Sequence, residues 1–527
     1  MSRVWPFLHS FLSACRQRLL ARETLFCALA LSPLSLVIML KFPVLWRDYD
    51  GLGQITAPPG HLIILAQPPL YPFLSRLPIL FVSALSGLAH PHLLKVNINR
   101  PVLLNNLGLV LLVIAQHLAL LFALALLVVA CSRRAFVRCV IIIVLLCHPI
   151  LFVIAQFVSS EALSTILAIA LIAIVVHLAS EKELTRNGLI ALGLCLYATL
   201  MTRHNALVYF AFAPLVFLFE TIVFLPDQGK RHAHVRKFLI TSAVSATAVI
   251  AVQLTVLSLC LVFHEPYRFV IGRSLIYRFD LIDRMPTEEK AAYLHKLQTS
   301  ASDPITKEAI PAVLEAKGYW GDSMRVIKDL IQRHGQRLGG NKLDARADHY
   351  LNEICQLYYQ APPPVLLADI RDAIVHSLSR TTPSEIIQFF YQNAENSLAL
   401  YRSRPDFREK TEYLASCSAR AESQIQRAKK TWWLRGFDRI PCGITLGIIL
   451  ALTIILRRLG RLEGKALRLV LALGVVDALM IIGTLSLSPY IPRYVLPSCV
   501  INVSALAILL GGFDSLSPRL LSQKRST

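Results

Sequence analysis

The chain of 527 residues is 55% hydrophobic and only 17% charged, with a mean hydropathy of +0.55, which excludes an ordinary soluble globular protein. The formal net charge of +21 does not indicate nucleic-acid binding, because the polar segment 263–437 holds 25 Lys and Arg against 21 Asp and Glu. The basic excess lies in short stretches between apolar runs, which is typical of the cytoplasmic loops of membrane proteins.

Apolar runs long enough to cross about 30 Å of hydrocarbon recur along the chain. The first, Thr24–Trp46, follows a basic N-terminus and is too long for a cleaved signal peptide, so we predict a retained span. The further runs are, in chain order, Leu103–Val129, Cys139–Phe157, Ala162–Ala179, Leu189–Met201, Ala206–Leu225, Phe238–Val262, Cys442–Leu456, Leu469–Leu487 and Tyr494–Leu510. The sequence therefore predicts an all-α polytopic membrane protein with about ten transmembrane helices.

Charge predicts how these spans are oriented. Basic residues gather in alternate connections, such as Arg133–Arg138 and Lys230–Lys237. Connections of this kind stay in the cytoplasm, so these loops and both termini are predicted to be cytoplasmic. The extracytoplasmic side then receives the short links near Ser160, Arg203 and Arg493, together with two longer segments. Any chemistry in those links is expected to be extracytoplasmic.

The two longer outer segments differ in character. The first, 47–102, alternates prolines with apolar pieces such as Ile79–Leu88, which are too short to span and suit interfacial helices. The second, 263–437, carries apolar residues at three- and four-residue spacing and is predicted to be mostly helical. We therefore expect an N-terminal transmembrane module (1–262), a helical extracytoplasmic segment (263–437) and C-terminal transmembrane helices (438–527).

Two acidic residues, Asp48 and Asp50, follow the first span directly. A carboxylate at the outer membrane surface can act as a general base on an incoming hydroxyl or help to hold a divalent cation. The alternative is a solvated helix end, since Asp-x-Asp alone is a weak motif. A divalent metal cation is the one cofactor suggested, with Asp48 and Asp50 as its candidate ligands, and the sequence does not decide whether one is bound.

Two arginines, Arg203 and Arg493, occupy very short outer links. The guanidinium fork suits phosphate, so the pair could grip a lipid-linked phosphate at the outer leaflet. Each could equally snorkel from a helix end, and the neighbouring His204 is more simply a structural or interfacial histidine. Glu161, at another outer link, either orients an arginine or caps the following helix.

Other motifs narrow the choice of function. Asp477 lies inside a predicted span, where ionisable side chains are usually paired or functional. The sequence has no P-loop, no HExxH, no nucleophile elbow and no Rossmann glycine pattern, so an ATP-driven pump and a soluble-type hydrolase have no support. The eleven cysteines follow no metal-ligand spacing.

Five short pieces on the predicted outer face carry a resemblance to a known superfamily. They are Arg47-Asp48-Tyr49-Asp50, Gln67-Pro68-Pro69-Leu70-Tyr71-Pro72, Ser160-Glu161-Ala162-Leu163, Thr202-Arg203-His204-Asn205 and Arg493-Tyr494-Val495-Leu496-Pro497. In this order they resemble the polytopic GT-C glycosyltransferases, which include the dolichyl-phosphate-mannose protein mannosyltransferases and the bacterial lipid A aminoarabinose transferases. The resemblance covers roughly the first 280 residues and the last 60, whereas the segment 286–430 matches nothing in the superfamily.

The resemblance implies transfer of a hexosyl or pentosyl group from a polyprenyl-phosphate donor to an acceptor hydroxyl, with inversion at the anomeric carbon. The acceptor would be a glycolipid, polysaccharide or protein outside the cytoplasm, and the enzyme would lie in a bacterial inner membrane. An aspartate would deprotonate the acceptor while cations stabilise the departing lipid phosphate.

The resemblance also implies roles for eight residues. They are the catalytic carboxylates Asp48 and Asp50, the donor-phosphate ligands Arg203, Arg493, His204 and Tyr494, and the supporting residues Glu161 and Tyr71. Superfamily members often have Asp-Glu or a lone Asp after the first span, so the choice of base between Asp48 and Asp50 stays open.

Two other functions remain as alternatives. An O-antigen ligase or polymerase also combines many spans with a large outer loop, but it should carry its key basic residues inside that loop and needs no acidic pair after the first span. A transporter or lipid flippase should show related halves with broken helices at matching positions, and the sequence contains no such repeat.

Overall fold

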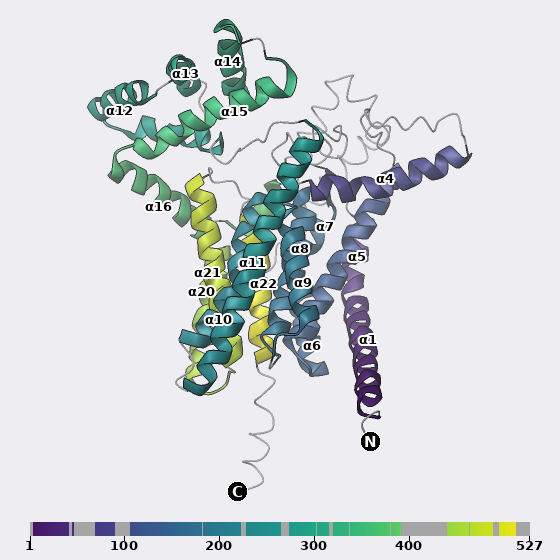
Figure 1. Cartoon of the computed structure of the whole chain (residues 1–527). Coiled ribbons are helices and arrows are strands. Elements are labelled where there is room, and N and C mark those ends of the chain that lie inside the picture. Colours follow the sequence, from purple (N-terminus) through teal and green to yellow (C-terminus); the bar gives the residue numbers. More distant parts are fainter. Residues whose placement is uncertain are drawn as a thin grey trace.

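In the computed structural model, the chain forms a long helical bundle with a second cluster of helices beyond one end of it (Figure 1). The structure describes residues 4–41, 45–46, 69–89, 106–181, 183–222, 228–264, 273–301, 303–315, 320–336, 338–379, 381–389, 392, 440–462, 464–487 and 495–512. The predicted all-α class is confirmed. Helix α1 begins and helix α22 ends at the end of the bundle away from the second cluster (Figure 1).

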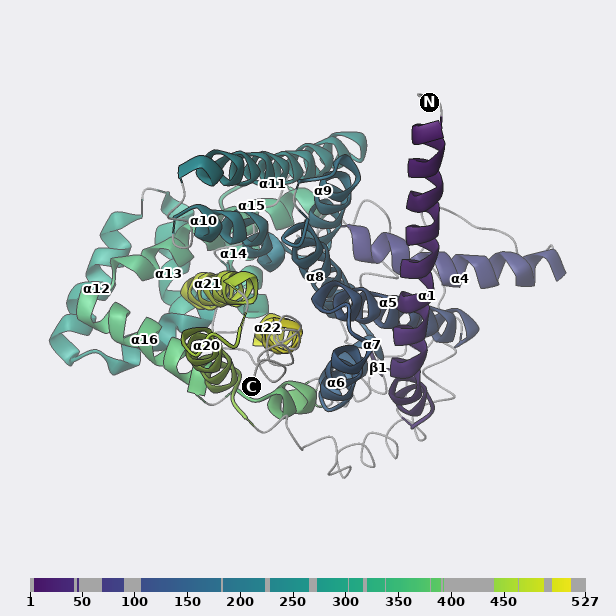
Figure 2. The same ribbon diagram turned by 90° about the horizontal axis from the view of Figure 1, so that it is seen from below.

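Helices from both transmembrane parts of the chain build one bundle. Its members include α1 (Val4–Lys41), α5 (Asn106–Cys131), α8 (Ser160–Leu178), α9 (Arg186–Leu200), α10 (Phe212–Ile222), α11 (Gln228–Val262), α20 (Cys442–Arg458), α21 (Gly464–Leu487) and α22 (Leu496–Gly511). Figure 2 shows α22 between α20, α21 and the helices of the N-terminal part. One hydrophobic core accordingly runs through both parts, with Leu124 of α5 and Val503 of α22 among its buried side chains.

The outer surface of the bundle is apolar. Large hydrophobic side chains are exposed around it, including Phe26 of α1, Leu118 of α5, Leu194 of α9, Leu261 of α11 and Ile455 of α20. A water-soluble protein rarely exposes so much contiguous apolar surface, whereas lipid chains solvate it well. The packing therefore agrees with a bundle that lies in a membrane.

The helices of the bundle differ in whether they are long enough to cross a membrane. Among the described residues, five helices are long and apolar enough to cross a membrane: Ala21–Leu40, Leu107–Cys131, Ser160–Leu178, His232–Val262 and Gly464–Gly483. The other predicted spans form shorter helices: α6 (Ala135–Leu146), α9, α10, α20 and α22. The 12 residues of α6 rise only about 18 Å at 1.5 Å per residue, well short of the hydrocarbon core. The predicted number of about ten transmembrane helices is thus not confirmed within the described residues.

One predicted span, Cys139–Phe157, is broken. Helix α6 ends at Leu146, a short helix α7 (Ile150–Ala155) follows, and the chain then extends as strand β2 (Phe157–Val158). Pro149 stands at the start of α7, and proline cannot continue a helix because it lacks the backbone N–H. Strand β2 pairs in parallel with β1 (Leu45–Trp46), so that Trp46 stands opposite Val158.

Polar side chains of α5 support this break. The amide of Gln116 donates hydrogen bonds to the carbonyl oxygens of Ala155 at 2.8 Å and Phe157 at 2.9 Å. Its neighbour His117 has Nε2 2.9 Å from Oε1 of Gln156. Irregular backbone inside a membrane protein needs such partners because lipid offers none. The side chains of α5 therefore hold the chain in the position from which α8 begins.

Helix α4 (Leu70–Ala89) lies across the end of the bundle (Figures 1 and 2). It buries Tyr71 and Ile79 on one face and exposes Phe73 and Phe81 on the other. The sequence predicted short interfacial pieces in this segment, and the structure has one amphipathic helix there, which contains Pro78. Such a helix suits the membrane surface.

The second cluster consists of helices from the large polar segment, seen at the upper left in Figure 1. They are η4 (Arg273–Arg284), α12 (Thr287–Ser300), α13 (Pro304–Glu315), α14 (Trp320–Arg333), α15 (Gly340–Gln356), η5 (Leu357–Gln360) and α16 (Pro363–Ser379). They enclose their own core around Leu281, Ile331, Leu351 and Tyr358. Helix α16 packs on α20 and α21 and so joins the cluster to the bundle.

Candidate functional site

Two predicted site residues, Glu161 and Arg203, form an ion pair. Nη1 of Arg203 lies 2.5 Å from Oε1 of Glu161 and donates a hydrogen bond to Oγ of Ser160 at 3.3 Å. Glu161 is the second residue of α8, and Arg203 stands in the link between α9 and the short helix η3 (His204–Ala211). The side chains are 3% and 16% exposed, respectively. The sequence left two roles for Glu161, orienting an arginine or capping the following helix, and this contact with Arg203 agrees with the first.

A third predicted residue, Tyr71, lies beside this pair. It is the second residue of α4, is buried, and interacts electrostatically with Glu161. Its hydroxyl finds no hydrogen-bond partner in the part of the chain that the structure describes. The backbone N–H of Leu70 donates to the carbonyl of Met201 at 3.0 Å, which fastens the start of α4 to the end of α9. Three pieces that are far apart in the sequence therefore meet at one end of the bundle.

A small cavity of about 20 Å³ opens beside the ion pair. Its lining comes from α8, η3 and α22, and consists of Glu161, Ser164, Thr165, Ala168, Arg203, Tyr209, Leu496, Pro497 and Val500. A cavity of this size has room for at least one water molecule. Leu496 and Pro497 belong to the last piece of the family resemblance, so α22 also reaches the site.

One lining residue of the cavity, Tyr209, is not among the residues that the sequence predicted. Tyr209 is 3% exposed, and its hydroxyl has no hydrogen-bond partner among the described residues. It interacts electrostatically with Asp477, whose Oδ1 accepts a hydrogen bond from Oγ of Ser498 at 2.6 Å. A tyrosine in an apolar run carries no spacing signal, so only the fold identifies Tyr209 as a lining residue.

The structure does not describe the side chains of the remaining predicted residues. Asp48, Asp50, Arg493 and Tyr494 lie outside the described residues, and of His204 only the backbone, at the start of η3, is described. Within the described ranges, no group of three or more His, Cys, Asp or Glu side chains could hold a metal ion. The metal site proposed at Asp48 and Asp50 therefore stays a prediction.

The charge of the site follows from the ion pair. Glu161 compensates Arg203, so the two side chains together bring no net positive charge to the cavity. The two side chains are thus a fixed pair of opposite charges more than a source of net positive charge.

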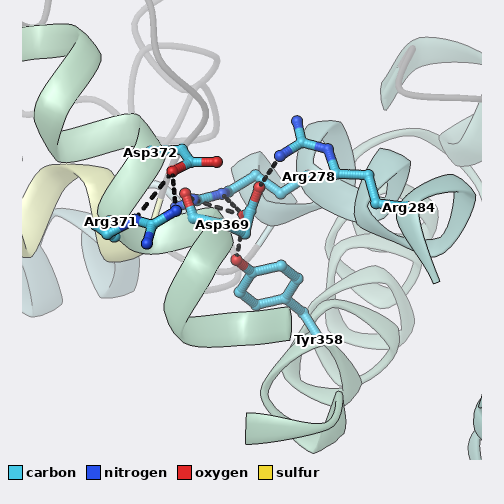
Figure 3. Close-up of polar contacts among 6 residues, drawn as sticks. All are labelled: Arg278, Arg284, Tyr358, Asp369, Arg371 and Asp372. Carbon is cyan, nitrogen blue, oxygen red and sulfur yellow. Dashed lines mark hydrogen bonds and ion pairs between the residues drawn. The ribbon is translucent and has the colours of Figure 1, made fainter. Parts of the chain in front are cut away.

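A second buried ion pair joins η4 to α16 in the outer cluster (Figure 3). Nη2 of Arg278 lies 2.6 Å from Oδ2 of Asp369, and Nη1 of Arg284 lies 3.4 Å from Oδ1. The hydroxyl of Tyr358 donates to Oδ2 at 2.6 Å. Burial, together with this hydrogen bond, raises the pKa of Tyr358 well above its ordinary value. Because each carboxylate oxygen of Asp369 has a cation or donor beside it, this cluster is suited to holding two helices together.

Comparisons with known proteins give two structural neighbours. No protein-family model matches the sequence, and no curated protein matches it either. ArnT from Cupriavidus metallidurans in the apo state shares 11% identity and a TM-score of 0.28, and the match covers 92% of this chain and 76% of that one. The archaeal oligosaccharyltransferase AglB from Archaeoglobus fulgidus, in complex with an inhibitory peptide and a dolichol-phosphate, shares 11% identity and a TM-score of 0.27. That match covers 97% of this chain and 58% of AglB.

Both neighbours are GT-C membrane glycosyltransferases, the superfamily that the sequence pieces resemble. Since both TM-scores are low, we base the functional proposal on the contacts of this chain.

Proposed function

We propose that this chain is a membrane glycosyltransferase that moves a sugar from a polyprenyl-phosphate donor to a hydroxyl of a glycolipid, polysaccharide or protein, with inversion. The reaction takes place on the extracytoplasmic side of a bacterial inner membrane. The observation that carries the proposal is the Glu161–Arg203 ion pair beside a cavity at the start of α8, close to where Leu70 of the surface helix α4 bonds Met201. A lipid-linked donor presents its phosphate and sugar at that depth.

Arg203 contacts the donor phosphate at the mouth of the cavity. Its side chain is more exposed than that of Glu161, so the guanidinium is the member of the pair that a ligand can reach. Since Glu161 compensates its charge, the departing phosphate dianion needs a further cation, and Arg493 supplies it. Arg493 precedes the buried Val495 by two residues, and two residues of chain span at most about 7 Å. His204 and Tyr494, the neighbours of these arginines, donate further hydrogen bonds to the phosphate.

An aspartate after the first span acts as general base. Asp48 follows Trp46 by two residues, and Trp46 pairs with Val158, three residues before Glu161. The chain between Trp46 and Asp48 spans at most about 7 Å, which keeps a carboxylate within reach of the cavity region. If a divalent cation is bound, Asp48 and Asp50 hold it.

The reaction is a single displacement. The base takes the proton of the acceptor hydroxyl, the acceptor oxygen attacks the anomeric carbon, and the bond from that carbon to the phosphate oxygen breaks. The bonding electrons leave with the polyprenyl phosphate, whose charge Arg203 and Arg493 stabilise. Attack from the face opposite the leaving group inverts the configuration.

The test is a donor-consumption assay. Purified full-length protein is incubated with membrane extract and, in separate reactions, radiolabelled undecaprenyl phosphate carrying mannose, glucose, galactose or arabinose. We expect one lipid to be consumed and its label to appear in an acceptor. Tyr197→Phe is the matched control, since Tyr197 bonds Thr255 away from the cavity lining. Consumption of none of the four lipids would contradict the proposed function.

A further inference from the structure

We propose that Cys442 and Cys499 form a disulfide bond, which joins α20 covalently to α22 at the end of the bundle that carries the candidate site. The disulfide is independent of the proposed glycosyl transfer and rests only on the proposed extracytoplasmic orientation of this end. Cys442 is the first residue of α20, and Cys499 is the fourth residue of α22. Both residues are buried.

The two sulfur atoms are in contact. Sγ of Cys442 lies 3.3 Å from Sγ of Cys499, although the residues are 57 positions apart in the chain. A disulfide bond is about 2.0 Å long, so the sulfur atoms need to approach by only about 1.3 Å, which rotations of two short side chains can provide. As free thiols the pair would gain no more than a weak hydrogen bond, because S–H is a poor donor. The contact therefore has the geometry from which a covalent bond can form.

Hydrogen bonds hold the backbone around the pair. Nδ2 of Asn502, three residues after Cys499, donates to the carbonyl oxygen of Cys442 at 2.8 Å. The backbone N–H of Cys442 donates to the carbonyl oxygen of Thr381 at 3.0 Å. Because these bonds fix the start of α20 against α22 and against the outer segment, the two sulfur atoms stay close to each other while the bond forms.

The proposed orientation places the pair where an oxidant is present. Disulfides form and persist on the extracytoplasmic side of bacterial membranes. One cysteine thiolate attacks the disulfide of an extracytoplasmic thiol–disulfide oxidoreductase, and the second thiolate displaces the oxidoreductase from the mixed disulfide. The two cysteines lose two electrons and two protons, and the oxidoreductase leaves as a dithiol. Since both residues are only 2% exposed after folding, the exchange takes place while α22 docks on α20, and the finished bond is shielded from reductants.

The bond fixes one wall of the cavity. Pro497 and Val500, on either side of Cys499 in the chain, line the cavity beside the ion pair. The start of α20 packs in turn against Leu378 of α16, the helix that joins the outer cluster to the bundle. The disulfide therefore connects the outer cluster, through α20, to the helix that lines the candidate site.

The native methionines allow the bond to be detected in the full chain. Cyanogen bromide cleaves after methionine, and cleavage after Met480 separates the fragment that holds Cys442 from the fragment 481–527, whose only cysteine is Cys499. Bacterial cells that express the chain are precipitated with acid and alkylated with N-ethylmaleimide in SDS, so that no thiol oxidises after lysis. The chain is then purified without reductant and cleaved, and its fragments are identified by mass spectrometry.

In the wild type, we expect most of the fragment 481–527 to be free of N-ethylmaleimide and joined to the fragment that holds Cys442. Reduction should separate the two. Cys442→Ser should abolish the joined product and leave Cys499 alkylated. The matched control is Cys131→Ser, which removes a cysteine that lies against the other end of α22, at Gly511, and should keep the joined product.

Three results would overturn the disulfide: alkylation of Cys499 in most wild-type molecules, a link from Cys499 to a different fragment, or a link that survives Cys442→Ser. If Cys442→Ser does not accumulate, sequencing of the linked wild-type peptides identifies the partner of Cys499 directly. An absent link with normal sugar transfer would reject the disulfide alone. An intact link without transfer in the donor-consumption assay would reject the proposed function and leave the disulfide standing.

Discussion

Nη1 of Arg203 lies 2.5 Å from Oε1 of Glu161, and the carboxylate is the more deeply buried of the two groups. We therefore predict that Arg203→Met destabilises the chain by about 3 kcal/mol, the lower end for a broken buried pair, since it leaves a buried carboxylate without its cation. The double variant Glu161→Gln with Arg203→Met should recover most of this loss. Arg203→Lys should fold normally and transfer sugar more slowly, because lysine lacks the planar fork.

Denaturant unfolding in detergent measures these free energies. The control is Lys290→Met, because the Lys290–Asp283 pair at 3.1 Å is exposed on both sides and such pairs contribute little. A loss from Arg203→Met no larger than that from Lys290→Met would contradict the assignment of a buried pair. Wild-type turnover of Arg203→Lys would remove Arg203 from the donor site.

Gln116 should be important for stability despite its place within an apolar helix. Its amide donates a hydrogen bond to each of the backbone carbonyls of Ala155 and Phe157. The substitution Gln116→Leu removes both hydrogen bonds. We expect a loss of about 1–3 kcal/mol in the free energy of unfolding. The control Gln253→Leu alters an exposed glutamine of α11 and should cost far less. Equal melting temperatures for the two variants would contradict this role of Gln116.

Tyr358 should make the outer cluster sensitive to alkali. Burial and the hydrogen bond to Asp369 raise the pKa of Tyr358 above its ordinary value of 10.0. The folded protein thus holds this proton more tightly than the unfolded chain does. The contribution of Tyr358 to stability is full below about pH 10 and is lost as pH rises beyond it toward the folded pKa. The difference in the free energy of unfolding between wild type and Tyr358→Phe should therefore be smaller at about pH 11 than at about pH 9. A gap that stays constant over this range would contradict the prediction.

The predicted topology can be tested with single cysteines at two exposed helical positions. In a background in which the eleven native cysteines are replaced by Ser or Ala, Glu289→Cys of α12 should react with an impermeant maleimide added to intact cells. His232→Cys, near the start of α11, should react only after the cells are permeabilised. Labelling of His232→Cys from outside would overturn the orientation, and the extracytoplasmic reaction with it.

The sequence predicted the helical bundle because apolar runs leave few alternatives in a membrane, where each backbone polar group needs an internal partner. It failed to predict the break after α6. An apolar run continues through Pro149, and hydropathy does not register the missing N–H. The polar pair Gln116 and His117 inside the apolar helix α5 was the available signal for that break, since such residues in a span are usually paired.

The candidate site was predictable only in part. Glu161 and Arg203 stood out because charged residues are rare in short outer links, but their pairing depends on how α8 packs on α9. Asp477 stood out for the same reason, and its partner Ser498 follows from the packing of α21 on α22. Tyr209 carries neither charge nor motif, so its place in the cavity lining is a consequence of tertiary structure alone.

The last prediction concerns Asp48 and Asp50, one of which we expect to be the base while the other orients it or a metal. In an extended Asp-x-Asp, both side chains point to the same side. Two carboxylates in close proximity repel each other, which raises the pKa of one unless a cation intervenes, and either outcome suits the proposed chemistry. Loss of a general base costs about 10²- to 10⁴-fold in rate.

Asp→Asn at the true base should therefore abolish detectable transfer and leave binding of the donor lipid nearly unchanged, whereas Asn at the other aspartate should reduce transfer less. The donor-consumption assay measures transfer, and the affinity of each variant in lipid nanodiscs for the donor lipid measures binding separately. Full activity of both single variants would reject the mechanism. Activity that survives chelation would exclude an exchangeable metal and leave the base role standing, because deprotonation of the acceptor hydroxyl by a carboxylate needs no metal.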